Sequence, residues 1–133
     1  MQLEIVTPDR RVAISETSDV IIPGLAGEFE VGPGHEPYLA LIGTGILTFK
    51  SGSSLVKLMV QGGFAEIDAD KVTLMCERAS LKEEVMNDEE NRQLEQALVK
   101  LRDLGTVAPD DETFELIKAE VDRATAKIAL AKL

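Results

Sequence analysis

Short apolar segments separated by turn residues fill the first eighty positions of the chain. Most are four to seven residues long, and many alternate apolar and polar positions with period two, which is typical of strands. Nine of them follow one another: LEIVT, RVAIS, DVIIPG, EFEV, YLALI, GILTFK, LVKLMV, FAEID and KVTLMCE. Because no helical pattern lies between them, we expect an antiparallel β-sandwich or barrel rather than a parallel α/β fold.

The period of the apolar positions changes beyond residue 84. A first stripe has spacings of three, four and three, at Leu94, Ala97, Leu101 and Leu104. A second stripe continues this helical spacing, at Phe114, Ile117, Val121, Ala124, Ile128 and Ala131. Asn87 and Gly105 are suited to begin and end the first helix, and Asp110 or Asp111 to begin the second. The short link between them predicts an antiparallel αα-hairpin at residues 88–133, following a β domain at residues 1–84.

Composition and charge exclude several classes of partner. The chain has 133 residues, of which 44% are apolar and 29% charged, as expected of a globular protein. Its net charge of −10 argues against nonspecific binding to nucleic acid or to anionic lipid, because both would repel it. No segment approaches the roughly 20 apolar residues that span a membrane, and the N-terminus does not resemble a signal peptide. We therefore expect a soluble, cytosolic protein without direct membrane insertion.

The residues needed for catalysis or metal binding do not come together in the sequence. Nucleophilic catalysis requires a nucleophile beside a base, but His35 is the single histidine and no G-x-S-x-G motif is present. Cys76 lies in an apolar run, which indicates a buried thiol rather than a metal ligand. The glycine-rich segments match neither G-x-x-x-x-G-K-[ST] nor G-x-G-x-x-G. The pattern therefore predicts an interaction module that is not an enzyme and that has no catalytic or metal site.

One segment, GEFEVGPGHEPYLALIGTG at residues 27–45, carries a resemblance to a known family. It follows IPG, contains the motifs GEF and PGH-x-P-x-L, and ends where the G-x-L motif at Gly45–Leu47 begins. VTPDR precedes it near the N-terminus. QGGFAEI and VTLMCERA follow in order. Together these motifs resemble the epsilon subunit of bacterial and chloroplast F-type ATP synthases, a family that includes the mitochondrial delta subunit. The resemblance extends over all 133 residues.

The resemblance implies a fold, a function and a set of partners. It implies an N-terminal antiparallel β-sandwich of about ten strands, which packs on the gamma subunit and on the c-ring in the central stalk. It also implies a C-terminal αα-hairpin that reaches the alpha/beta catalytic head and can inhibit ATP hydrolysis. Such a subunit is non-catalytic and requires no cofactor, and it couples proton translocation to ATP synthesis. Its expected location is peripheral, at the cytoplasmic face of the bacterial inner membrane.

The same resemblance implies roles for particular residues of the β domain. Gly27, Glu28 and Phe29 match the turn that faces the c-ring, where Glu28 would contact polar loops of the ring. His35, in the PGH motif, matches the side that faces gamma. Two alternatives stay open: Glu28 is a solvated turn residue, and His35 caps a turn through its ring. On either reading, the glycine-rich segment is architecture rather than a catalytic loop.

The hairpin carries two further candidate sites. Arg123, Lys127 and Lys132 match basic positions that meet an acidic segment of the catalytic beta subunits. The alternative is that cations near a helix C-terminus stabilise its dipole. Some bacterial members also bind ATP on the hairpin, and the corresponding residues here are Glu89, Arg92 and Arg123. Since neighbouring carboxylates would repel a triphosphate and the motif is incomplete, we expect weak ATP binding at most.

A second functional class remains to be weighed. In this alternative, the chain is a β-sandwich ligand-binding module that dimerises through its αα-hairpin. Such a module would need exposed aromatic side chains or a polar pocket on one sheet face. With no tryptophan, one tyrosine and four phenylalanines, the chain has few residues for sugar stacking.

Overall fold

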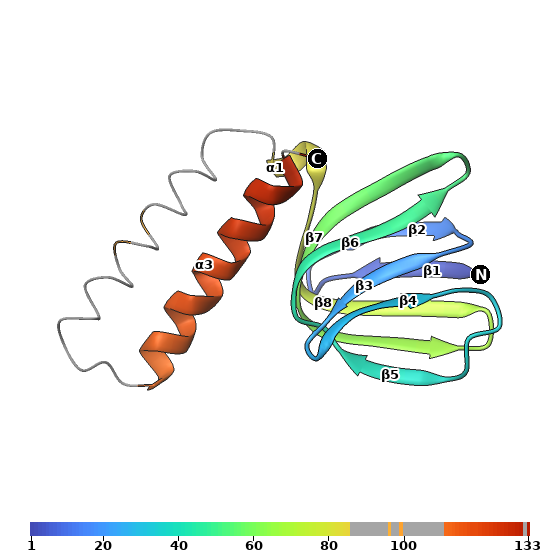
Figure 1. Ribbon diagram of the computed structural model, residues 1–133, viewed down its shortest axis with the longest axis horizontal. Helices are drawn as coiled ribbons and strands as arrows, with labels where there is room; N and C mark the ends of the chain where they lie inside the picture. Colours follow the sequence, from blue (N-terminus) through green and yellow to red (C-terminus); the bar gives the residue numbers. More distant parts are fainter. Residues whose placement is uncertain (86–95, 97–98, 100–110, 132) are drawn as a thin grey trace.

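The computed structural model describes residues 1–85, 96, 99, 111–131 and 133. A folded-over β-sheet occupies the N-terminal part and a long helix lies against it (Figure 1). The strands are β1 (Gln2–Val6), β2 (Arg11–Glu16), β3 (Val20–Gly24), β4 (Gly27–Val31), β5 (Tyr38–Leu41), β6 (Thr44–Ser51), β7 (Ser54–Asp68) and β8 (Lys71–Leu81). The helices are α1 (Lys82–Val85) and α3 (Asp111–Ala131).

The expectation of about ten strands is wrong for the described part of the chain, where the sheet has eight. LVKLMV and FAEID are two halves of the single strand β7, which the QGG segment does not interrupt. Gly62 and Gly63 have φ values of 68° and 101°, so the strand changes direction there while its pairing with β8 continues on both sides. A side chain at Gly63 would overlap the carbonyl oxygen of Met75. The glycines therefore produce a bend rather than a turn.

This bend lets the sheet fold over on itself. Before it, β7 pairs with β6, and after it, β7 pairs with β5. All strands except β5 form one continuous path of hydrogen-bonded neighbours, in the order β2-β1-β8-β7-β6-β3-β4. Strands that pass from one layer to another through a bend are a known way to make the corners of packed sheets. The layers that result are visible in Figure 1.

One pair of strands departs from the predicted antiparallel arrangement, since β1 pairs with β8 in parallel. Parallel neighbours need a long connection, and here all of the chain from β2 to β7 provides it. The other strand pairs are antiparallel. Local turn signals predicted those pairs but carry no information about a pairing between the two ends of the domain.

The main hydrophobic core lies between the layers of the folded sheet. Alternate residues of the strands face it, as period-two patterning predicts. Its buried members are Leu3, Ile5, Val20, Ile22, Val31, Ile42, Leu47, Phe49, Leu58, Val60, Ala65, Ile67, Val72, Leu74 and Cys76. Burial raises the pKa of the Cys76 thiol to about 12, which agrees with the predicted inert, buried cysteine.

The helix α3 (Asp111–Ala131) covers most of the predicted second helix of the hairpin and packs against β6 and β7. The predicted start of that helix, at Asp110 or Asp111, borders residues outside the described part and stays a prediction. The predicted first helix lies almost entirely outside the described residues. At the end of β8 the short helix α1 leads out of the sheet, close to the predicted domain boundary. Among the described helices, none has the length and apolar character needed to cross a bilayer.

Candidate functional site

The first predicted interface lies at the turn between β3 and β4. Gly24 pairs with Gly27, and the two residues between them form the tip of the hairpin. Gly27 has a φ of 135°, and a side chain at Gly24 would come within 2.6 Å of the Gly27 carbonyl oxygen, so the tight turn requires both glycines. The backbone N–H of Leu25 donates to the carbonyl of Leu41 at 2.9 Å. This bond holds the tip against the end of β5.

The four predicted interface residues of the β domain do not share one environment. Gly27 and Glu28 are exposed at the turn, where a partner can reach them. Phe29 is partly buried instead, because its ring packs against the main core and lies edge-on to Tyr38, with centroids 5.8 Å apart. The His35 ring is half-buried, and its Nδ1 lies 2.7 Å from the carbonyl oxygen of Glu36. This contact is consistent with the proposed turn-capping role of His35.

Beside this turn lies an exposed apolar patch that the sequence analysis did not single out. It consists of Leu25, Tyr38, Leu39 and Leu41, all more than half exposed. A cavity of about 740 Å³ lies among these residues, Glu28, Phe29 and His35. Exposed apolar patches on small proteins mark interaction surfaces. The signal was present in β5, where YLAL is apolar at every position and therefore apolar on both faces.

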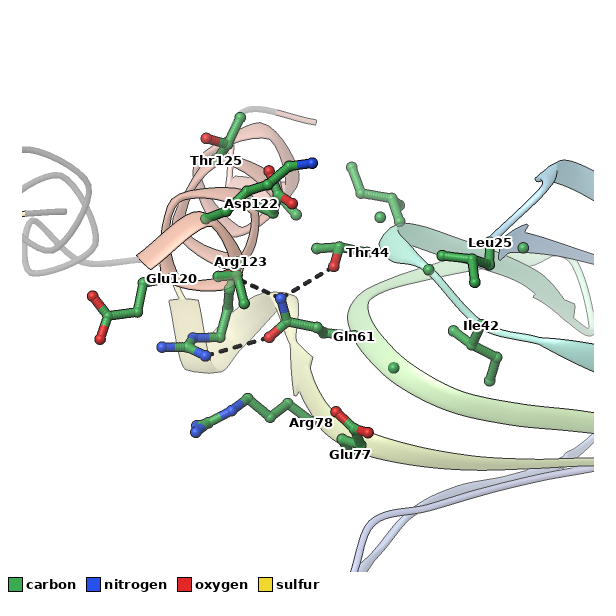
Figure 2. A pocket seen from close by; sticks show the side chains of 18 of the residues that line it. Leu25, Ile42, Thr44, Gln61, Glu77, Arg78, Glu120, Asp122, Arg123 and Thr125 are labelled. Atoms are coloured by element: carbon green, nitrogen blue, oxygen red, sulfur yellow. Dashed lines mark hydrogen bonds between the residues drawn. The ribbon is translucent and has the colours of Figure 1, made fainter. Parts of the chain in front are cut away.

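The described residues of the second predicted interface, Arg123 and Lys127 of α3, lie on the side of the helix that faces the sheet. Figure 2 shows the Arg123 guanidinium beside the amide of Gln61, and Arg123 Nη1 donates to Gln61 Oε1 at 3.3 Å. Lys127 lines a hollow with Arg10, Arg78 and Glu84. Lys132 lies outside the described residues, as do Glu89 and Arg92 of the predicted ATP site. The contacts with beta and the weak binding of ATP therefore stay predictions.

A salt bridge joins the β1–β2 turn to α1. Arg10 Nη2 lies 2.7 and 2.9 Å from the two carboxylate oxygens of Glu84. The backbone N–H of Leu81 donates to the same carboxylate at 2.9 Å. These hydrogen bonds, and then the charges of Arg10 and Lys127, hold the pKa of Glu84 below its ordinary value. Lys82 Nζ also donates to the carbonyl of Leu133, so α1 is tied to the chain beyond α3.

Among the described residues, no group of three or more His, Cys, Asp or Glu side chains could hold a metal ion.

Residues 1–82 match the family described as "ATP synthase, Delta/Epsilon chain, beta-sandwich domain". The chain belongs to this family. Membership in the delta/epsilon family confirms the predicted function as an epsilon subunit of ATP synthase, which is a non-catalytic subunit.

Relatives of the delta/epsilon family match nearly all of the chain. An ATP synthase epsilon chain of Geobacter sulfurreducens is 30% identical over 131 residues, covering 98% of this chain and 93% of the relative. An ATP synthase epsilon chain of Nitratidesulfovibrio vulgaris is 34% identical over 132 residues, covering 99% of this chain and 89% of the relative. The similarity therefore extends beyond the β domain into the predicted hairpin.

Two solved structures are similar in fold. One is a chain in the Euglena gracilis mitochondrial ATP synthase, in a structure of OSCP, F1 and the c-ring, with a TM-score of 0.78 and 22% identity. The match covers 96% of this chain and 78% of that one. The other is in the central stalk and c-ring of the Tetrahymena thermophila mitochondrial ATP synthase, with a TM-score of 0.67 and 11% identity. It covers 98% of this chain and 95% of that one.

Proposed function

We propose that the chain is a rotor component that links the gamma subunit to the c-ring, so that proton translocation is coupled to ATP synthesis. Membership in the delta/epsilon family supports this function. So does the fold shared with chains in structures of a central stalk and c-ring. Through the assembled complex, the subunit would lie at the cytoplasmic face of the bacterial inner membrane. Family membership also favours this function over the alternative of a dimerising ligand-binding module.

The observation that carries the proposal is the exposed apolar patch at Leu25, Tyr38, Leu39 and Leu41. Three of its residues lie on β5, which pairs with β7 along one edge and with no second strand of the described sheet along the other. Apolar side chains of this size at an exposed edge favour a permanent partner. Glu28 adds a carboxylate at the rim, where it can set orientation through basic or polar groups of the c-ring.

The hairpin would supply regulation. In this proposal the domain at residues 88–133 leaves the β domain at residues 1–84 and extends to the alpha/beta catalytic head, where it inhibits hydrolysis. Arg123, Lys127 and Lys132 would then meet acidic groups of beta. Moving such an equilibrium from 1:99 to 99:1 requires about 5.5 kcal/mol of differential binding. Together, a few ion pairs that become desolvated on contact supply a binding free energy of this order.

The proposal is tested by adding the purified chain to epsilon-depleted ATP synthase from its own source. We expect tight binding, recovery of ATP-driven proton pumping, and reduced hydrolysis that deletion of residues 88–133 restores. Absence of binding would refute the rotor function. Binding without any effect of the deletion on hydrolysis would remove the regulatory role and leave the coupling role.

A matched pair of variants tests the patch itself. Leu39 is 66% exposed within the patch, whereas Leu55 is 60% exposed at the distant β6–β7 turn. We expect Leu39→Glu to weaken binding by roughly tenfold or more, because it places a charge in an apolar contact. Leu55→Glu makes the same chemical change at similar exposure and should bind like the unmodified chain. Equal effects of the two variants would show that the patch is not the interface.

A further inference from the structure

Two neighbouring cross-strand pairs form the surface on which α3 rests. Gln61 of β7 lies opposite Thr44 of β6, and Met59 lies opposite Ile46. Side chains along a strand alternate between faces, and the intervening Val60 belongs to the main core. Met59 and Gln61 therefore point to the opposite face, toward the helix. This face carries one polar pair and one apolar pair, side by side.

The face of α3 that rests on the sheet also has a polar part and an apolar part. Ala119, Arg123, Ala126 and Leu130 are spaced by four, three and four, so they share one face of α3. Ala126 and Leu130 form a small buried cluster with Met59, and Ile46 packs against it. Ala119 and Arg123 lie over the polar pair instead.

Gln61 connects the polar groups of the sheet with those of the helix (Figure 2). It is 8% exposed, and only Thr17 accompanies it as a buried polar side chain among the described residues. Its Nε2 donates to Thr44 Oγ1 at 3.1 Å and to the Ala119 carbonyl at 2.9 Å. Its Oε1 accepts from Arg123 Nη1 at 3.3 Å. Both ends of the amide are satisfied while α3 is docked, as burial requires.

We propose that Gln61 is a polar latch that sets how firmly α3 is held on the sheet and that occupies Arg123 while the helix is docked. A glutamine suits this task because water replaces its partners when the helix leaves, so that its bonds add only a modest net free energy to docking. An anionic group of a partner would bind the Arg123 guanidinium more strongly than the neutral amide does. Such a group would therefore favour release. This regulatory consequence rests on the proposed function of the hairpin, whereas the latch itself does not.

The latch is tested on the purified full-length chain by amide hydrogen exchange of residues 115–130. Gln61→Met keeps the length of the side chain and removes both ends of the amide. We expect exchange of the α3 amides to accelerate by roughly tenfold, because hydrogen bonds to buried and charged groups are lost. Thr125→Ala is the matched control, since this exposed hydroxyl donates to the Val121 carbonyl of its own helix, at 2.8 Å, rather than to the sheet. The control should leave exchange unchanged.

A double-mutant cycle with Arg123→Met separates the latch from general packing. If Gln61 and Arg123 act together, the double variant will exchange little faster than the more affected single variant. Unchanged exchange in Gln61→Met, or two effects that simply add, would overturn the latch. Amides of β7 serve as the internal reference, because a change there would report a disturbed sheet rather than a released helix.

The regulatory role needs a second readout, in reconstituted ATP synthase. Gln61→Met should inhibit hydrolysis at a lower chain concentration than the unmodified chain, because its helix is released more easily. Faster exchange with unchanged inhibition would overturn the regulatory role of the latch. Failure of the unmodified chain to bind the synthase would instead refute the proposed function, and the exchange result would be unaffected. The two failures are therefore distinguishable.

Discussion

Replacement of Leu130 by alanine should release α3 without unfolding the sheet. Leu130 is fully buried, but its cluster contains only two other buried residues within the described chain, Met59 and Ala126. The main core is a separate cluster of fifteen buried residues. Because Leu130 is not a member of the main core, its loss should weaken the docking of the helix and leave the stability of the β domain nearly unchanged.

The size of the effect follows from the atoms removed. Leucine to alanine deletes three carbon groups, and each is worth roughly 0.8 kcal/mol on transfer from water. Incomplete collapse of the site adds a cavity cost, which places such substitutions at about 2–5 kcal/mol. Since the site lies between a helix and a sheet rather than inside the main core, we expect the lower end, about 2–3 kcal/mol. A loss of 2 kcal/mol shifts the docking equilibrium by roughly 30-fold.

The assay combines hydrogen exchange of the α3 amides with denaturant unfolding of the sheet. Leu47 supplies the matched control, because it is equally buried but belongs to the main core. We expect Leu130→Ala to accelerate exchange in α3 and leave the unfolding midpoint of the sheet almost unchanged. Leu47→Ala should lower the free energy of unfolding by about 2–5 kcal/mol. The reasoning is refuted if Leu130→Ala lowers the stability of the sheet as much as Leu47→Ala does.

Three further predictions concern the β domain and its junction. Gly63→Ala should strongly destabilise the sheet in thermal unfolding, because the new side chain would overlap the Met75 carbonyl and adopt a strained positive φ. Cys76 should not react with a thiol reagent at pH 8 until the chain is unfolded, because its pKa is raised to about 12. The Arg10–Glu84 salt bridge should stabilise the chain above the ordinary pKa of Glu84 and lose its effect as pH falls through the lowered value. In denaturation experiments Glu84→Gln should therefore cost less than about 1 kcal/mol at pH 7 and nothing in strong acid.

The sequence was informative wherever one face of a strand or helix meets a core. Alternation of apolar and polar residues located the strands, and the change of period located α3, which begins at Asp111. The pattern predicted nine strands where the described part of the structure has eight, because QGG between LVKLMV and FAEID was interpreted as a turn. Two adjacent glycines accept positive φ in either a turn or a bend, so local sequence does not distinguish them. The parallel pairing of β1 with β8 is a long-range contact that leaves no local signal.

The docking surface of α3 was missed for a different reason. The predicted stripe includes Ala124 and Ile128, whereas the face on the sheet includes Arg123, Ala126 and Leu130. This face is mixed in polarity, so a search for apolar spacing passes over it. A signal did exist in β7, where Leu58, Met59 and Val60 are three consecutive apolar residues. A strand that is apolar on successive positions is covered on both faces.

The predicted interface residues of the β domain also show where sequence patterns stop being informative. A resemblance of motifs indicated the turn at Gly27 and Glu28, and both are exposed there. It also included Phe29, whose ring packs largely inward. A motif records which residues recur at a place in the chain, but it does not separate those that shape a turn from those that a partner touches. Exposure makes that distinction, and it adds Leu39 and Leu41 from a different strand.

The α3 docking surface has a polar and an apolar part, and the free energy of docking that they supply together is of a size suited to a switch. Burial of Leu130 is worth roughly 1.5–3 kcal/mol, and the alanine beside it adds less. The bonds of Gln61 add about 0.5–1.5 kcal/mol each at most, because water competes for the same groups. The free energy of docking is therefore a few kcal/mol. This is close to the roughly 5.5 kcal/mol of differential binding that moves a two-state equilibrium from 1:99 to 99:1. The bonds of Gln61 are exchanged for bonds to water or to a partner when the helix leaves, so the glutamine keeps docking within the reach of a partner's binding energy.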